Sequence, residues 1–216
     1  RTAFDIGPLA GPRTGVGHAV AAMHHELQGR DDVALVDYLI SFRAKVTAGT
    51  VRLPMPAALA HRCWSRLDVP RADRWLRADV VHGTNYVVPP TRRPSVVSVY
   101  DCWFLRHPTS AAPAVRRAGD VLRRAIARGA VVHASSTSTA DEVRDLFPSA
   151  SVEVIHLGPL PVAESPAAPV IADLGERRMV LAIGTLERRK NLPRLVRAFA
   201  SIATEHADTV LVLAGG

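Results

Sequence analysis

Strand-length apolar segments alternate with helix-length segments along most of this chain, and that alternation restricts its fold more than any other feature. The stretch 15–29 carries apolar residues at helical spacing from Val16 to Leu27, whereas 95–101 (SVVSVYD) has the pattern of a short buried strand. Strand, helix and strand in repeated order predict a parallel sheet with helices on both faces. The expected strands are 2–9, 33–40, 79–86, 95–101, 130–136 and 151–158, and the expected helices are 15–29, 113–128 and 139–147.

Local signals refine two of these segments. The helix 139–147 has Ser138 or Thr139 as its expected N-cap, with Glu142 placed for a capping box. The stretch 54–75 is interrupted by prolines and is expected to be helical only in part.

A proline-rich stretch interrupts the pattern and divides the chain into an expected domain order. Residues 159–178 contain four prolines and little periodicity, which is typical of a linker. A strand at 179–183, a helix at 192–204 and a strand at 209–213 follow. One such unit is too small for a domain, so we expect the front part of a longer two-domain protein. The predicted divisions are 1–165, a linker at 166–178 and an incomplete second domain at 179–216; alternatively, the last unit extends the first sheet.

Charge and composition narrow the class of partner. The formal net charge of +7 favours anionic ligands such as nucleotide phosphates or acidic lipid, although a solvated basic surface explains it equally well. Cys63 and Cys102 form no CxxC pair, so neither a zinc site nor a disulfide framework is expected. No apolar run approaches the ~20 residues of a membrane span. No signal-peptide pattern opens the sequence. We therefore expect a cytoplasmic protein without a metal.

Glycines follow the first expected strand at the start of a helix. Gly15 and Gly17 would let a ligand approach the backbone where the helix amino terminus favours an anion. The pattern lacks the third glycine of a dinucleotide fingerprint, and Asp37 does not close its strand as an NAD-binding acid would. A tight turn without a ligand is the alternative explanation.

Polar residues end two further strands. Thr84 and Asn85 could donate hydrogen bonds to a polar ligand or could serve only the turn. Tyr100 and Asp101 end the next strand, where Asp101 could position a sugar hydroxyl or a neighbouring backbone amide.

Three adjacent cations occupy the turn between the strand 179–183 and the helix 192–204. Arg189 can bind two phosphate oxygens at once, Lys190 adds a point charge, and the helix amino terminus adds a partial positive charge. We therefore interpret the turn as a diphosphate clamp. The alternative is a solvated basic turn, which opposes the helix dipole by several tenths of a kcal/mol per cation.

Five stretches resemble the group 1 (family 4) retaining glycosyltransferases of the GT-B fold. IGTLERRKNLPRLVRAFA resembles the opening of that family's second domain, and VVSVYDCWFLRHP resembles its Val-His-Asp segment. HGTNYVVPP, ASSTSTADEVRDLFP and VEVIHLGP follow the family's order. The resemblance covers nearly the whole chain.

This resemblance implies two Rossmann-like domains that face a cleft, the second of them truncated here. The first would hold a saccharide or lipid-linked acceptor, and the second would hold the nucleotide sugar, with GDP-mannose favoured over UDP-sugars. It also implies a site: Gly184, Arg189 and Lys190 bind the donor; Asp101 lies beside the reacting sugar; and Gly15, Gly17, Asn85 and Tyr100 line the cleft.

Two features depart from the family. Tyr100 stands where the family usually has histidine, and the family's downstream Glu-x7-Glu motif is absent, because the sequence ends at Gly216 before the motif could occur. We therefore expect sugar transfer with retention of configuration, in polysaccharide or glycolipid assembly, from a longer protein, and an inactive fragment in these 216 residues. A nucleotide-sugar epimerase and a non-catalytic acceptor-binding fragment are the alternatives.

The basic helix at 113–128 suggests a second kind of partner. Its arginines could rest on acidic lipid, or they could form a solvated helix face. The cations are otherwise spread over several segments without a nucleic-acid-binding motif, so nucleic acid is not an expected partner. The arginines concerned are Arg116, Arg117, Arg123, Arg124 and Arg128.

Overall fold

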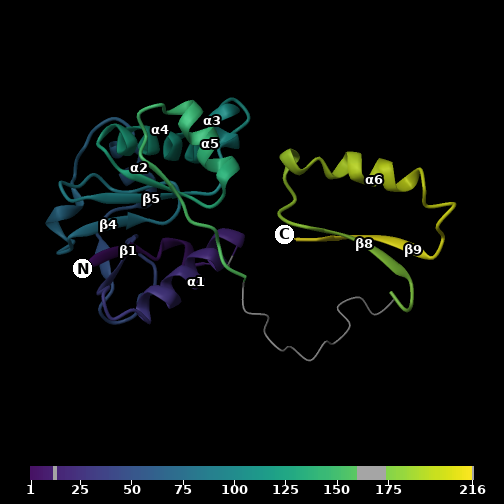
Figure 1. The fold of residues 1–216 in the computed structure, drawn as a ribbon, viewed down its shortest axis with the longest axis horizontal. Coiled ribbons are helices and arrows are strands. Elements are labelled where there is room, and N and C mark those ends of the chain that lie inside the picture. Colours follow the sequence, from purple (N-terminus) through teal and green to yellow (C-terminus); the bar gives the residue numbers. More distant parts are fainter. Residues whose placement is uncertain (12–13, 160–173, 216) are drawn as a thin grey trace. The chain divides into compact units, whose positions relative to one another are not determined.

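A computed structural model describes residues 1–11, 14–159 and 174–215 of the protein. The chain divides into two compact units, residues 1–161 and 162–216, and each is described here by itself (Figure 1). Most of the linker predicted at 166–178, namely residues 166–173, lies outside the described residues.

The first unit is built on a sheet of seven strands in the order β3-β2-β1-β4-β5-β6-β7, and every neighbouring pair is parallel. Helices lie on both faces of the sheet, with α1 on the opposite side from α2 and α4 (Figure 1). The predicted α/β, Rossmann-like parallel sheet is therefore confirmed. The strands are β1 (Thr2–Asp5), β2 (Leu35–Ile40), β3 (Val51–Leu53), β4 (Val80–Gly83), β5 (Ser95–Val99), β6 (Val131–Ala134) and β7 (Val152–Val154).

Helices in the first unit follow the predicted amphipathic segments closely. The helix predicted at 15–29 is α1, and the one predicted at 113–128 is α4. Two short elements, β3 and α3, were not predicted, because three or four residues are too few to establish a periodicity. The helices are α1 (Gly15–Gln28), α2 (Ala57–Trp64), α3 (Trp103–Arg106), α4 (Pro113–Ala127) and α5 (Thr137–Leu146), with short 3-10 turns at Gly7–Leu9 and Ala72–Arg74.

The core fills the space between the sheet and its helices. Trp64 of α2 is fully buried, and its indole NH donates to the carbonyl of Pro70 at 3.0 Å. Strand residues such as Val81 and Val97 are buried almost completely, as expected of a sheet covered on both faces.

The N-cap of α5 differs from the prediction. The cap is Ser136, whose hydroxyl oxygen accepts the backbone NH of Thr139 at 3.1 Å. The Thr139 hydroxyl instead donates to the carbonyl of Tyr100 at 3.1 Å, so Thr139 bridges to a neighbouring strand end. The capping box expected with Glu142 is therefore wrong, because the helix begins two residues earlier.

The second unit is a single strand-helix-strand motif. Its strands β8 (Arg178–Ile183) and β9 (Thr209–Ala214) are parallel and form a two-stranded sheet separate from the first. The alternative that this unit extends the first sheet is therefore wrong. Between the strands lie a 3-10 turn (Arg188–Lys190) and α6 (Leu192–Ala200), which ends four residues before the predicted boundary.

Candidate functional site

The strand order of the first sheet reverses between β1 and β4, and a ligand is expected at such a point. The chain leaves β1 to form β2 on one side and later returns to form β4 on the other side. Loops that follow β1 and β4 therefore diverge, and open α/β sheets bind ligands at this reversal of strand order. The residues concerned lie after Asp5 and after Gly83.

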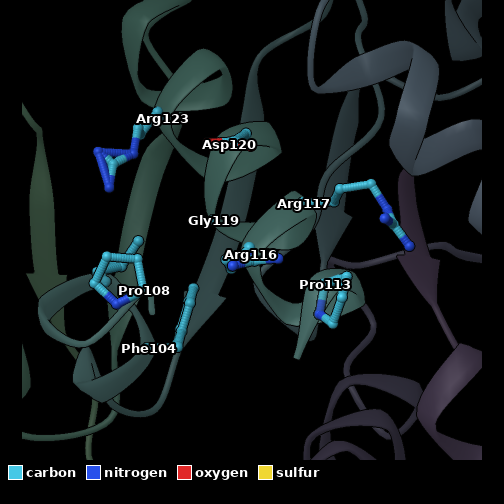
Figure 2. A pocket seen from close by; sticks show the side chains of 9 residues that line it. Phe104, Pro108, Pro113, Arg116, Arg117, Gly119, Asp120 and Arg123 are labelled. Atoms are coloured by element: carbon cyan, nitrogen blue, oxygen red, sulfur yellow. The ribbon is translucent and has the colours of Figure 1, made fainter. Parts of the chain in front are cut away.

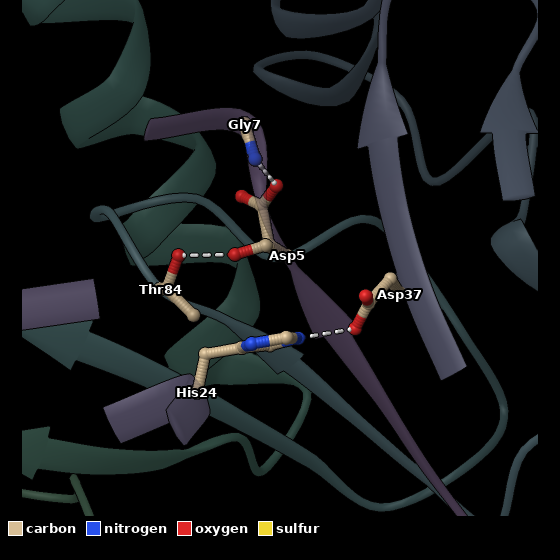
Figure 3. Close-up of polar contacts among 5 residues, drawn as sticks. All are labelled: Asp5, Gly7, His24, Asp37 and Thr84. Atoms are coloured by element: carbon tan, nitrogen blue, oxygen red, sulfur yellow. Dashed lines mark hydrogen bonds and ion pairs between the residues drawn. The ribbon is translucent and has the colours of Figure 1, made fainter. Parts of the chain in front are cut away.

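Asp5, at the end of β1, is the functional candidate that the sequence interpretation missed. It is only 8% exposed, and its Oδ1 accepts the backbone NH of Gly7 at 2.8 Å (Figure 3). Burial raises the pKa of this carboxyl to about 7, although the hydrogen bond from Gly7 acts in the opposite direction. A carboxyl that changes its charge near neutral pH at a strand end is a candidate for binding or proton transfer. The available signal was an acidic residue within an otherwise apolar strand.

Two adjacent residues of the turn after β4, which the sequence analysis gave the same possible role, differ in the structure. Thr84 is fully buried, and its hydroxyl donates to the carbonyl of Asp5 at 2.7 Å (Figure 3). That bond ties the ends of β1 and β4 together and makes Thr84 structural. Asn85 is exposed at the turn, which leaves its amide available for a ligand.

Tyr100 holds the same turn from the next strand. Its hydroxyl donates to the carbonyl of Thr84 at 2.8 Å, and its ring packs edge-on against Tyr86 with the ring centroids 5.8 Å apart. Burial raises the pKa of the Tyr100 phenol to about 12, so the hydroxyl remains a hydrogen-bond donor. Tyr100 therefore positions the turn after β4, and its place beside a cleft stays a prediction.

Asp101 is half-buried at the start of α3. Its Oδ1 accepts the backbone NH of Trp103 at 3.1 Å, which is the second of the two roles considered for it. A contact between Asp101 and a reacting sugar stays a prediction.

The predicted glycines lie at the first turn of α1. Gly17 is buried, and its NH donates to the hydroxyl of the N-cap Thr14 at 3.4 Å. Gly15 is exposed, and no atom would lie within 4 Å of a Cβ at this position. Among the described residues, the space beside Gly15 is therefore open. Nearby, Asp37 is bound to Nε2 of His24 at 2.8 Å, so this carboxylate is already engaged (Figure 3).

In the second unit, the structure brings two of the three predicted donor-binding residues together. Gly184 has a φ of +147°, and a Cβ there would lie 3.8 Å from Cε of Lys190. Both residues line a pocket of about 190 Å³ beside the amino end of α6. Arg189 does not line this pocket: its Nε donates to Oε2 of Glu187 at 2.5 Å. Of the two cations predicted to form a diphosphate clamp, Lys190 therefore lines the pocket, and diphosphate binding stays a prediction.

A chain of hydrogen bonds crosses the first sheet from β6 through β5 to β4. Nε2 of His133 bonds to the carbonyl of Ile155 at 3.0 Å, which requires a proton on this nitrogen. In a neutral ring, Nδ1 then accepts the Ser98 hydroxyl at 2.9 Å, and Ser98 accepts Nε2–H of His82 at 2.8 Å. Ser98 is fully buried, so this serine–histidine contact is structural rather than nucleophilic. Burial lowers the pKa of His82 to about 4.

Two kinds of site do not occur in the described part of the chain. No cluster of three or more His, Cys, Asp or Glu residues suitable for a metal ion is found within 1–11, 14–159 and 174–215. Across these same ranges, none of the helices combines the length and the hydropathy that membrane crossing requires.

The strand order and the helices define an α/β protein with a Rossmann-like, doubly wound parallel sheet, followed by a smaller strand-helix-strand unit. No protein-family model matches the sequence, and no curated protein matches it.

Proposed function

We propose that this protein is a retaining glycosyltransferase of the GT-B type, which transfers a sugar from a nucleotide sugar to a saccharide or lipid-linked acceptor. The observation that carries the proposal is the position of Lys190 over Gly184, beside the amino end of α6. An ammonium group and the helix terminus together favour a diphosphate in that pocket. Among nucleotide sugars we favour GDP-mannose, because the RRKN turn resembles that of the group 1 (family 4) glycosyltransferases, for which this donor is favoured over UDP-sugars.

In this proposal the chemistry needs no metal. Negative charge develops on the diphosphate as the bond between it and the sugar breaks, and a fixed cation stabilises that charge. Lys190 would supply most of this effect, because Arg189 must first give up its contact with Glu187. The first unit would hold the acceptor at the reversal of strand order, where Asn85 and Asp5 offer an amide and a carboxyl.

One observation favours a second candidate, a non-catalytic binding protein of the same fold. The resemblance places a histidine contact to the sugar at position 100, whereas the Tyr100 hydroxyl is held by the carbonyl of Thr84. A protein that binds the donor or the acceptor without transfer would tolerate this change. A transfer assay with protein that binds GDP-mannose separates the two candidates.

Nucleotide-dependent thermal stabilisation tests the proposed donor site. We expect GDP or GDP-mannose, at 100 times its dissociation constant, to stabilise the second unit by about 2.7 kcal/mol. We expect this shift to disappear in Lys190→Ala, because the charge over Gly184 is lost. Scanning fluorimetry with GDP, UDP and GDP-mannose measures the effect.

Arg188→Ala is the matched control, since Arg188 occupies the same turn but does not line the pocket. This variant should keep the nucleotide shift of the wild type. Two results would contradict the site: an equal shift in Lys190→Ala and wild type, or no shift with any of the three nucleotides.

A further inference from the structure

The first unit has a pocket of its own, between α3 and α4, and its lining residues are not those that follow β1 and β4. It has a volume of about 280 Å³, and Figure 2 shows its lining side chains. Phe104 and Pro108 supply apolar walls, whereas Arg116, Arg117 and Arg123 bring three cations and Asp120 one carboxylate. The pocket therefore combines an apolar wall with an excess of two positive charges.

The arginines of α4 do not form a single basic face, contrary to the sequence expectation. Arg124 and Arg128 both form an ion pair with the same carboxylate, Asp68, at 3.1 and 2.7 Å, so these two cations are directed toward Asp68. Arg116, Arg117 and Arg123 instead line the pocket, and no carboxylate in the described ranges forms an ion pair with them.

Two of these cations have defined surroundings. The guanidinium carbon of Arg123 lies 5.8 Å from the ring centroid of Phe147, a cation–π distance that restricts its side chain. Arg117 lies close enough to His61 to lower the pKa of that ring, after burial as the larger cause. An anion that neutralised Arg117 would remove this repulsion.

We propose that the pocket between α3 and α4 binds a phosphate monoester. Such a group carries a charge of about −1.5 to −2 at pH 7, which matches the two excess positive charges, whereas a carboxylate carries only one. Arginine binds phosphate oxygens through paired NH groups. Arg116 and Arg123 are seven residues apart and lie about 10 Å from one another along the helix. The phosphate therefore sits between them, and its carbon substituent contacts Phe104 and Pro108.

Two sources offer this chemistry, and one experiment separates them. Glycerol 3-phosphate presents the monoester in solution, and vesicles of phosphatidylcholine with phosphatidic acid present it at a membrane surface. Calorimetry measures the first, and vesicle co-sedimentation measures the second, with pure phosphatidylcholine as the blank. If the protein binds only the vesicles, the ligand is a lipid headgroup. If it binds both probes, the phosphate monoester is sufficient for binding without a membrane.

Matched variants then decide whether the pocket is responsible. We expect R116Q/R123Q to weaken binding by about tenfold or more, and D120N to tighten it severalfold by removing a competing carboxylate. The control R92Q/R93Q removes the same charge from exposed positions before β5 and should change binding less than about twofold.

Two results would overturn the proposal. The first is that the wild-type protein binds neither glycerol 3-phosphate nor phosphatidic acid vesicles. The second is that R92Q/R93Q weakens binding as much as R116Q/R123Q, which would show a general effect of surface charge. Circular dichroism of each variant checks that the fold is retained.

Discussion

Replacing Gly83 by alanine is expected to lower the free energy of unfolding of the first unit by about 4 kcal/mol or more. A Cβ at position 83 would lie 1.9 Å from the carbonyl oxygen of Val87 and 2.8 Å from Cα of Val88. Both atoms belong to the backbone of buried residues, so neither can move aside without disturbing the turn after β4. A loss of this size approaches the whole stability of many domains.

Chemical denaturation followed by circular dichroism measures this loss. The matched control is Gly11→Ala, since no described residue places an atom within 4 Å of a Cβ there. That variant should stay within about 0.5 kcal/mol of wild type, as surface substitutions usually do. Equal denaturation midpoints for wild type and Gly83→Ala would show that the close approach of Val87 is absent in solution.

The pH dependence of stability should be small in the wild type because two buried groups oppose each other. Asp5 has its pKa raised from 3.8 to about 7, so between these values the folded state holds a proton that the unfolded state has lost. Stability therefore falls as pH rises through this range. His82 has its pKa lowered from 6.5 to about 4, so there the unfolded state holds the extra proton. The contribution of His82 to the free energy of unfolding therefore rises with pH over nearly the same range.

Single substitutions should expose each of these opposing effects. In Asp5→Asn the stability should fall by about 3 kcal/mol, relative to wild type, as pH drops from 6.5 to 4. In His82→Gln it should fall by about 3 kcal/mol, relative to wild type, as pH rises from 4 to 7. Asparagine keeps the oxygen that accepts from Gly7, and glutamine can still donate to Ser98, so the hydrogen bonds are preserved.

Denaturation midpoints at half-unit pH intervals measure these slopes. Taking each variant against wild type removes the contribution of other titrating groups. Parallel curves for all three proteins would contradict the assigned burial of both groups.

Sequence periodicity was sufficient for the elements with repeated apolar positions. The helices α1 and α4 and the strands β5 and β6 lie within one or two residues of their predicted ends, or inside them. Their burial pattern is a local property of the chain, because residues two apart in a strand, and three or four apart in a helix, lie on the same face. The parallel sheet followed from the order of these elements.

Periodicity could not predict elements that form only because they contact another segment of the chain. β3 is three residues long and is a strand because it pairs with β2 from Tyr38 to Ile40. The deciding contact for β3 joins two segments of the chain, and local periodicity does not report it. The cap of α5 is a local contact, since the Ser136 hydroxyl accepts the NH of Thr139, while the Thr139 hydroxyl is engaged by the carbonyl of Tyr100 in another segment.

For the candidate sites, too, some features followed from local sequence and others only from tertiary contacts. The amino acid sequence alone determined the alternation of strands and helices, the glycines at the start of α1 and the cations before α6, because each is a pattern of neighbouring residues. Tertiary structure alone decided that Asp5 is buried at the reversal of strand order and that Lys190, not Arg189, lies over Gly184. It also turned Arg124 toward Asp68 and left Arg116 in a pocket, since burial and charge pairing depend on which distant segments meet.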